Sequence, residues 1–149
     1  MAYWDTSALL KLYVSEPESS KLEEVADSAA GPIQSSAIAP VEMICALARK
    51  EGSGELSRGE LIEIFTEIGR DVAAGRIAII PFGDDVVREA AKLVRLPPAG
   101  SRRGMIRALD LIHLASAVAV RARSIVTTDA RLRELAALAG MEVLPERPY

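Results

Sequence analysis

The chain has 149 residues, half of them hydrophobic but only 4% aromatic, which suits a single domain, residues 1–149, with an aliphatic core. Its net charge of −3 argues against a protein that coats nucleic acid, although an enzyme can still place acids in a cleft and bases on its rim. We expect a cytoplasmic protein without membrane association, because no apolar run reaches the length of a membrane span, the N-terminus does not resemble a signal peptide, and the single Cys45 cannot form an internal disulfide.

Taken in chain order, short apolar stretches alternate with segments of helical periodicity. We expect strands at 2–5, 32–36, 76–80, 124–128 and 141–144. We expect helices directly behind Asp5 and at 15–30, 37–50, 57–74, 84–94, 105–123 and 132–139, and a loop at 96–104. This alternation predicts an α/β fold, in which a mainly parallel sheet of about five strands lies between two layers of helices.

The helix expected at 37–50 carries apolar residues at helical spacing, which predicts its buried face. These residues are Ile38, Val41, Ile44, Cys45 and Ala48. Glu42 lies beside this stripe, close to the start of the helix.

Four acidic residues lie where a parallel sheet would bring them together. Two predicted strands end on an aspartate, Asp5 and Asp129, and each of these alone could be only the N-cap of the helix behind it. The carboxyl ends of parallel strands share one edge, where ligands bind in open α/β sheets. Glu42 and Asp110 lie near the first turns of two helices and can reach the same edge. Asp110 is enclosed by the apolar run 108–112, where a carboxylate needs a cation or a proton.

Carboxylates gathered at one edge predict a metal site. They repel one another and raise one another's pKa values unless a cation lies among them. Oxygen ligands favour Mg²⁺ or Mn²⁺ over Zn²⁺, which prefers nitrogen and sulfur. Such an ion can polarise a phosphodiester and help to generate a nucleophile from water, so the sequence predicts metal-dependent phosphoryl chemistry.

Four short motifs follow one another along the chain: Asp-Thr-Ser-Ala-Leu at 5–9, Val-Glu at 41–42, Leu-Asp-Leu-Ile-His-Leu-Ala-Ser-Ala at 109–117 and Thr-Thr-Asp-Ala-Arg-Leu at 127–132. They resemble the motifs of the PIN domain family, and most closely those of the VapC toxins of prokaryotic toxin–antitoxin pairs. Each motif alone is weak. All four in order, on an alternating strand–helix chain of this length, make the resemblance specific, and it extends from Tyr3 to about Leu144.

The resemblance implies a PIN-like three-layer fold and a Mg²⁺- or Mn²⁺-dependent endoribonuclease. It further implies an RNA substrate, a small VapB-like antitoxin as partner, and a homodimer. Carried over residue by residue, the catalytic acids would be Asp5, Glu42, Asp110 and Asp129. Among these, Asp5 and Asp110 would bind the metal directly. Glu42 and Asp129 would act through water, orient the nucleophile or hold a second ion.

Other side chains would support these acids or bind RNA. Thr127 matches the family's hydroxyl position, Ser7 either caps a helix or contacts substrate, and His113, the only histidine, is interpreted as a hydrogen-bonded helper. We expect Tyr3 and Trp4 to pack in the core rather than stack on bases. The arginines expected to hold RNA phosphates are Arg102, Arg103, Arg107 and Arg131, with Arg133 beside them in the sequence.

Two other functions are compatible with parts of this pattern. A PIN-type RNA-processing nuclease without an antitoxin would need the same four acids. A receiver-like signalling module would also place Mg²⁺ beside a strand-end aspartate, but Asp84-Asp85 does not follow the first strand and no lysine ends a late strand. A Gly-rich nucleotide-binding loop is absent from the sequence.

Overall fold

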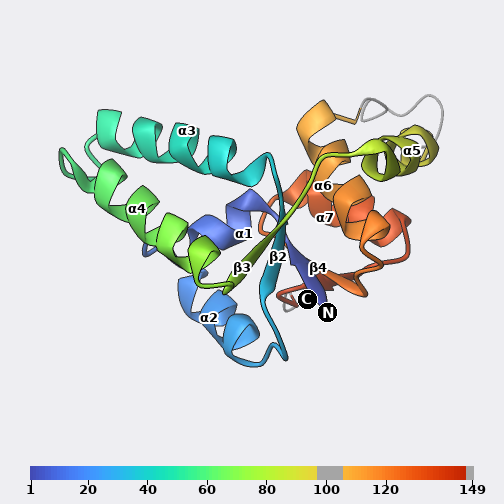
Figure 1. The fold of residues 1–149 in the computed structure, drawn as a ribbon, viewed down its shortest axis with the longest axis horizontal. Helices are drawn as coiled ribbons and strands as arrows, with labels where there is room; N and C mark the ends of the chain where they lie inside the picture. Colours follow the sequence, from blue (N-terminus) through green and yellow to red (C-terminus); the bar gives the residue numbers. More distant parts are fainter. Residues whose placement is uncertain (97–105, 147–149) are drawn as a thin grey trace.

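A five-stranded parallel sheet forms the centre of the computed structural model, which describes residues 1–96 and 106–146 (Figure 1). Its strands lie in the order β3-β2-β1-β4-β5, and each neighbouring pair is parallel. The strands are β1 (Ala2–Trp4), β2 (Ile33–Ser36), β3 (Ile77–Ile80), β4 (Ser124–Val126) and β5 (Glu142–Leu144). The predicted α/β class and the parallel sheet of about five strands are therefore confirmed.

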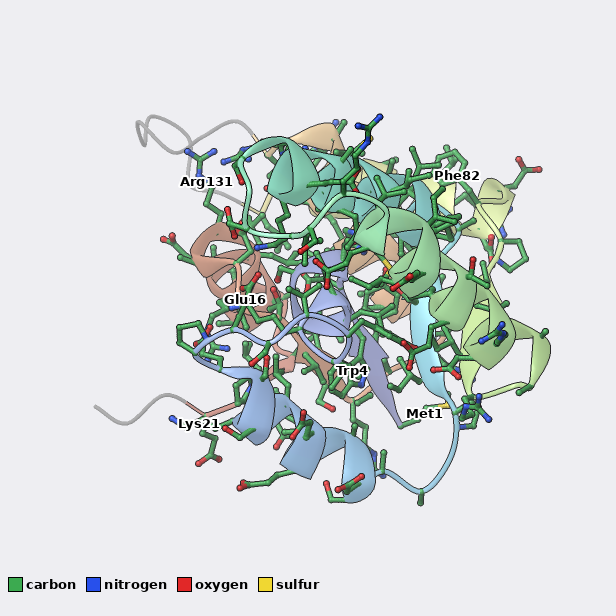
Figure 2. The ribbon with its side chains drawn as sticks, turned by 90° about the vertical axis from the view of Figure 1, so that its left-hand side faces the viewer. Met1, Trp4, Glu16, Lys21, Phe82 and Arg131 are labelled. Carbon is green, nitrogen blue, oxygen red and sulfur yellow. The ribbon has the colours of Figure 1, made fainter. Side chains whose placement is uncertain are left out.

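Helices cover both faces of the sheet (Figure 1). One layer holds α1 (Thr6–Leu10), α2 (Ser19–Asp27), α3 (Ala39–Gly52) and α4 (Glu60–Ala73), and the other holds α5 (Asp84–Leu93), α6 (Ala108–Ala119) and α7 (Ala130–Leu138). Successive side chains of a strand point to opposite faces. Tyr3 accordingly joins the core under α5 to α7. Trp4, which is labelled in Figure 2, packs with α1 and α2 on the other face. No described helix is long and apolar enough to cross a membrane.

The register of the sheet brings the ends of β1 and β4 level. Trp4 pairs with Val126, so the next residues, Asp5 and Thr127, leave the sheet side by side. The N–H of Asp5 donates to the carbonyl oxygen of Val126 at 3.1 Å, which continues the sheet ladder by one bond. The two segments then continue into α1 and α7, as expected at the ligand-binding edge of an open α/β sheet.

The buried face predicted for α3 is wrong. The helix buries Ala39, Met43 and Leu47, whereas Val41 is 64% exposed and Cys45 also faces outward. The segment is apolar on two opposite sides, because residues two positions apart, such as Val41 and Met43, lie about 200° apart around a helix. Packing against α1 and α4 selects the stripe with the bulky Met43 and Leu47.

The predicted helices differ from the observed ones mainly at their ends. α6 stops at Ala119, four residues earlier than predicted, and Arg121 just beyond it adopts a left-handed φ of 56°. Its predicted start at Met105 lies outside the described residues. α7 begins at Ala130, two residues earlier than expected, because the Asp129 carboxylate accepts hydrogen bonds from the first turn.

Candidate functional site

Asp5 lies at the centre of the candidate site and is buried, with only 4% of its surface exposed. Its Oδ1 accepts a hydrogen bond from the N–H of Ala8 at 3.0 Å, so Asp5 is the N-cap of α1. The Ser7 hydroxyl group lies 2.9 Å from both carboxylate oxygens, and Thr127 Oγ1 donates to Oδ2 at 2.8 Å. The cap interpretation, considered for Asp5 as a lone residue, thus holds together with a position inside the acidic cluster.

Burial raises the pKa of the Asp5 carboxyl group above its ordinary value. The nearby His113 and the hydrogen bonds from Ala8, Thr127 and Ser7 oppose this rise without cancelling it. A cation at this position would favour the ionised form in the same way.

Thr127 connects Asp5 to Asp129. Its Oγ1 donates to Asp5 and accepts from the N–H of Asp129 at 3.1 Å. Asp129 in turn caps α7, because its Oδ1 accepts from the N–H groups of Arg131 at 2.8 Å and Leu132 at 3.0 Å. The hydroxyl group that the sequence placed beside the acids is thus fully buried between two of them.

Ser7 also joins the ends of β1 and β4 through hydrogen bonds. Besides its bonds to Asp5, its Oγ accepts from the N–H of Thr128 at 3.1 Å. This arrangement assigns Ser7 a structural role at the site, whereas the helix cap expected of it is supplied by Asp5.

Glu42 enters the site from the first turn of α3 and is half-buried. Its Oε1 accepts a hydrogen bond from Thr6 Oγ1 at 2.7 Å and lies 2.6 Å from His113 Nε2. Burial acts to raise the pKa of Glu42, but the hydrogen bond and the positive charge of His113, with the Thr6 hydroxyl, lower it overall. Glu42 is therefore ionised at neutral pH.

Asp110 lies in the first turn of α6, on the same helix face as His113. Burial raises its pKa, and the negative charge of Asp129 raises it further, while Arg107, His113 and Arg131 act in the opposite direction. Asp110 and Asp129 are therefore close enough to repel each other. All four predicted acids thus lie in one region. Thr127 bonds to Asp5 and Asp129, and His113 bonds to Glu42. Charge interactions join Asp110 to Asp129 and to His113.

The chemistry of this region fits a hard divalent cation. Its donors are carboxylate and hydroxyl oxygens, and a cation would relieve the repulsion between Asp110 and Asp129. Among residues 1–96 and 106–146, however, no three acidic, histidine or cysteine side chains are already grouped closely enough to hold an ion. Binding would therefore require side-chain rotation, most simply of the half-exposed Asp110 and Asp129.

The structure describes two of the four predicted RNA-binding arginines. Arg107 and Arg131 are exposed, and both act electrostatically on Asp110 (Figure 2 labels Arg131 on α7). Arg102 and Arg103 lie outside the described residues. Arg133, which follows them in the sequence, instead donates to the carbonyl oxygens of Thr127, Leu144 and Pro145 and so fastens the end of β5.

Two contributors to the site were not predicted. The sequence indicates Thr6 only as part of the motif at 5–9, but its hydroxyl group donates a hydrogen bond to Glu42. Tyr3 was expected merely to pack, but its hydroxyl group lies 2.6 Å from His113 Nδ1. A polar atom on an inward-facing side chain was the signal available for Tyr3, because a buried hydroxyl group needs a partner.

The PIN domain family model matches residues 2–138, and the chain belongs to the PIN domain family. Ribonuclease VapC46 of Mycobacterium tuberculosis is 32% identical over an alignment of 150 positions, and the match covers 95% of this chain and 95% of that protein. This membership confirms the resemblance found in the sequence and decides against the receiver-like alternative.

Solved structures share the fold at low sequence identity. VapC20 of Mycobacterium tuberculosis, described as a toxin that cleaves the sarcin–ricin loop, is 11% identical with a TM-score of 0.66, covering 95% of this chain and 96% of its own. VapBC2 of Rickettsia felis, solved with a DNA fragment from its promoter, is 20% identical with a TM-score of 0.63, covering 96% and 97%. Both likenesses support the three-layer PIN-like fold.

Proposed function

We propose that this protein is a Mg²⁺- or Mn²⁺-dependent endoribonuclease that hydrolyses RNA phosphodiester bonds. The observation that carries the proposal is the connection of Asp5, Glu42, Asp110 and Asp129 at one edge of the sheet, in a chain of the PIN domain family. The name of the relative Ribonuclease VapC46 supports RNA as the substrate.

In this proposal the four acids have different roles in catalysis. Asp5 and Asp110 would hold the metal ion, which would supply a Lewis acid for the phosphodiester and offset the negative charge of the site. Glu42, ionised and anchored through Oε1, orients the attacking water molecule. Asp129 acts through water or helps to hold an ion. The exposed Arg107 and Arg131, with Arg102 and Arg103, bind phosphates of the RNA.

We further propose that residues 1–149 form one domain, which acts in the cytoplasm as a homodimer and is neutralised by a small VapB-like antitoxin. Support comes from the relatives, since VapBC2 is a structure of a VapB–VapC pair. A small reading frame for a DNA-binding protein next to this gene would favour a toxin. A gene without such a neighbour would favour an RNA-processing nuclease.

Replacement of Asp5 by Asn tests the proposed enzyme. Asp5→Asn keeps an oxygen that can cap α1 but removes the charge, so we expect Mg²⁺-dependent RNA cleavage to be lost while the fold persists. Asp71→Asn is a matched control, because Asp71 lies in α4, outside the site, where it accepts a hydrogen bond from the Tyr13 hydroxyl group, and its replacement should leave cleavage unchanged. Cleavage by Asp5→Asn at the wild-type rate would contradict the proposed site.

A further inference from the structure

His113 is buried with a hydrogen-bond partner at each ring nitrogen. Nδ1 lies 2.6 Å from the Tyr3 hydroxyl oxygen, and Nε2 lies 2.6 Å from Glu42 Oε1. An ionised carboxylate can only accept, so Nε2 must carry a proton. When the ring carries this proton alone, Nδ1 is an acceptor and the Tyr3 hydroxyl group donates to it. The direction of the bond from His113 to Glu42 follows from the carboxylate, and that of the bond from Tyr3 to His113 follows from the singly protonated ring.

Tyr3, the first residue in this chain of hydrogen bonds, is held rigidly by its surroundings. It lies in β1, the central strand, and its side chain is completely buried. Its ring also meets the His113 ring edge to face, with centroids 5.9 Å apart. Neither ring can turn without breaking this packing.

Glu42 receives its support on one oxygen only. Every hydrogen bond that the described residues make with its carboxylate group, from Thr6 and from His113, ends on Oε1. Oε2 is thereby left as the oxygen that can act on a water molecule or an ion. Because Glu42 is on α3 while His113 is on α6, the bond between them joins the two helix layers across the sheet edge.

We propose that Tyr3 and His113 are positioning residues, which orient Glu42 through Oε1 and so present Oε2 to the reacting centre. This inference rests on the proposed function, because it assigns a purpose to the orientation of Glu42 in RNA cleavage. It also gives His113 a role different from general base, since both of its ring nitrogens already have protein partners. Partners that orient functional carboxylates typically affect activity by about 10- to 100-fold.

Tyr3→Phe tests the proposal with the smallest change, because it removes one oxygen atom and keeps the ring. We expect the turnover number for RNA to fall about 3- to 10-fold with KM unchanged, since His113 loses the bond that fixes its ring. Tyr13→Phe is the matched control: its hydroxyl group donates to Asp71 Oδ2 at 2.5 Å, outside the site, and its removal should leave turnover unchanged. Equal turnover in the two variants would overturn the proposal.

Variants of His113 separate positioning from packing. His113→Leu should lower turnover about 10- to 100-fold. His113→Gln can place an amide N–H near the position of Nε2 and should recover a large part of that loss. Equal losses in both variants would contradict a role through the hydrogen bond to Glu42.

The protonation of His113 can be read without any activity assay. Because it is the only histidine, ¹⁵N-histidine labelling gives one set of two-bond ¹H–¹⁵N cross-peaks. We expect a protonated Nε2 in the wild type and a changed Nδ1 shift in Tyr3→Phe. A bare Nε2 with the proton on Nδ1 would overturn the proposal. If the wild type cleaves no RNA, the proposed function fails, and the spectrum still decides whether Tyr3 and His113 orient Glu42.

Discussion

Thr127 holds the two strand-end aspartates together, so removal of its hydroxyl group probes the core of the site. Its Oγ1 donates to the buried Asp5 at 2.8 Å and accepts from the N–H of Asp129 at 3.1 Å. A hydrogen bond to a charged group contributes about 1.5–3 kcal/mol. The N–H of Asp129 adds less to the loss, because that residue is half-exposed and water can replace its partner. We expect Thr127→Val to lower the free energy of unfolding by about 2–3 kcal/mol.

Urea and thermal unfolding in EDTA measure this loss, with the fluorescence of the single, buried Trp4 as the signal. The expected loss corresponds to a fall in Tm of about 4–12 °C for a chain of this length. Thr66→Val is the matched control. Its hydroxyl group bonds only to the Ile62 carbonyl oxygen on the exposed side of α4, so its cost should stay within about 0.5 kcal/mol.

A double-mutant cycle connects the loss to Asp5. In the Asp5→Asn background the partner of Thr127 is neutral, so the cost of Thr127→Val should fall to about 1 kcal/mol. An equal cost in both backgrounds would refute the reasoning, because the hydroxyl group would then stabilise the fold independently of the Asp5 charge.

Two further predictions concern charge. Burial raises the pKa of Asp5, so the folded state binds its proton more tightly than the unfolded state, and stability falls as pH rises from the ordinary value to the raised folded pKa. In EDTA, Asp5→Asn should therefore be more stable than the wild type at neutral pH and lose this pH dependence; unfolding curves with identical pH dependence would contradict it. Reversal of Arg102 and Arg103 to Glu should weaken RNA binding and flatten its salt dependence by about 0.7 per lost phosphate contact. Arg58→Glu, at the exposed turn between α3 and α4, is the control, and unchanged binding across a salt series would remove the two arginines from the interface.

The sequence was sufficient for the architecture because strand and helix patterns alternate and each has its own period. It was also sufficient to single out Asp5 and Asp129, since a strand that ends on an acid is visible in one dimension. The buried face of α3 could not be predicted in the same way. Val41 and Met43 lie on opposite apolar sides of the helix, and only the packing against α1 and α4 distinguishes them.

Long-range polar contacts were the other part that the sequence could not supply. Tyr3 and His113 are separated by 110 positions, and no spacing rule connects a strand residue to a helix residue over that distance. The same holds for Thr6 and Glu42, 36 positions apart. These contacts depend on the strand order β2-β1-β4, which places Thr6, at the start of α1, within reach of both Glu42 on α3 and His113 on α6.

The rate of RNA cleavage as a function of Mg²⁺ concentration tests the proposed metal site most directly. The account predicts no cleavage in EDTA, a saturating rise with Mg²⁺, and activity with Mn²⁺ in its place. Asp110→Asn should shift the rise to higher Mg²⁺ concentrations, because one of the two proposed ligands loses its charge. An equal rate of cleavage in EDTA and in Mg²⁺ would contradict the proposal that these carboxylates work through a divalent ion.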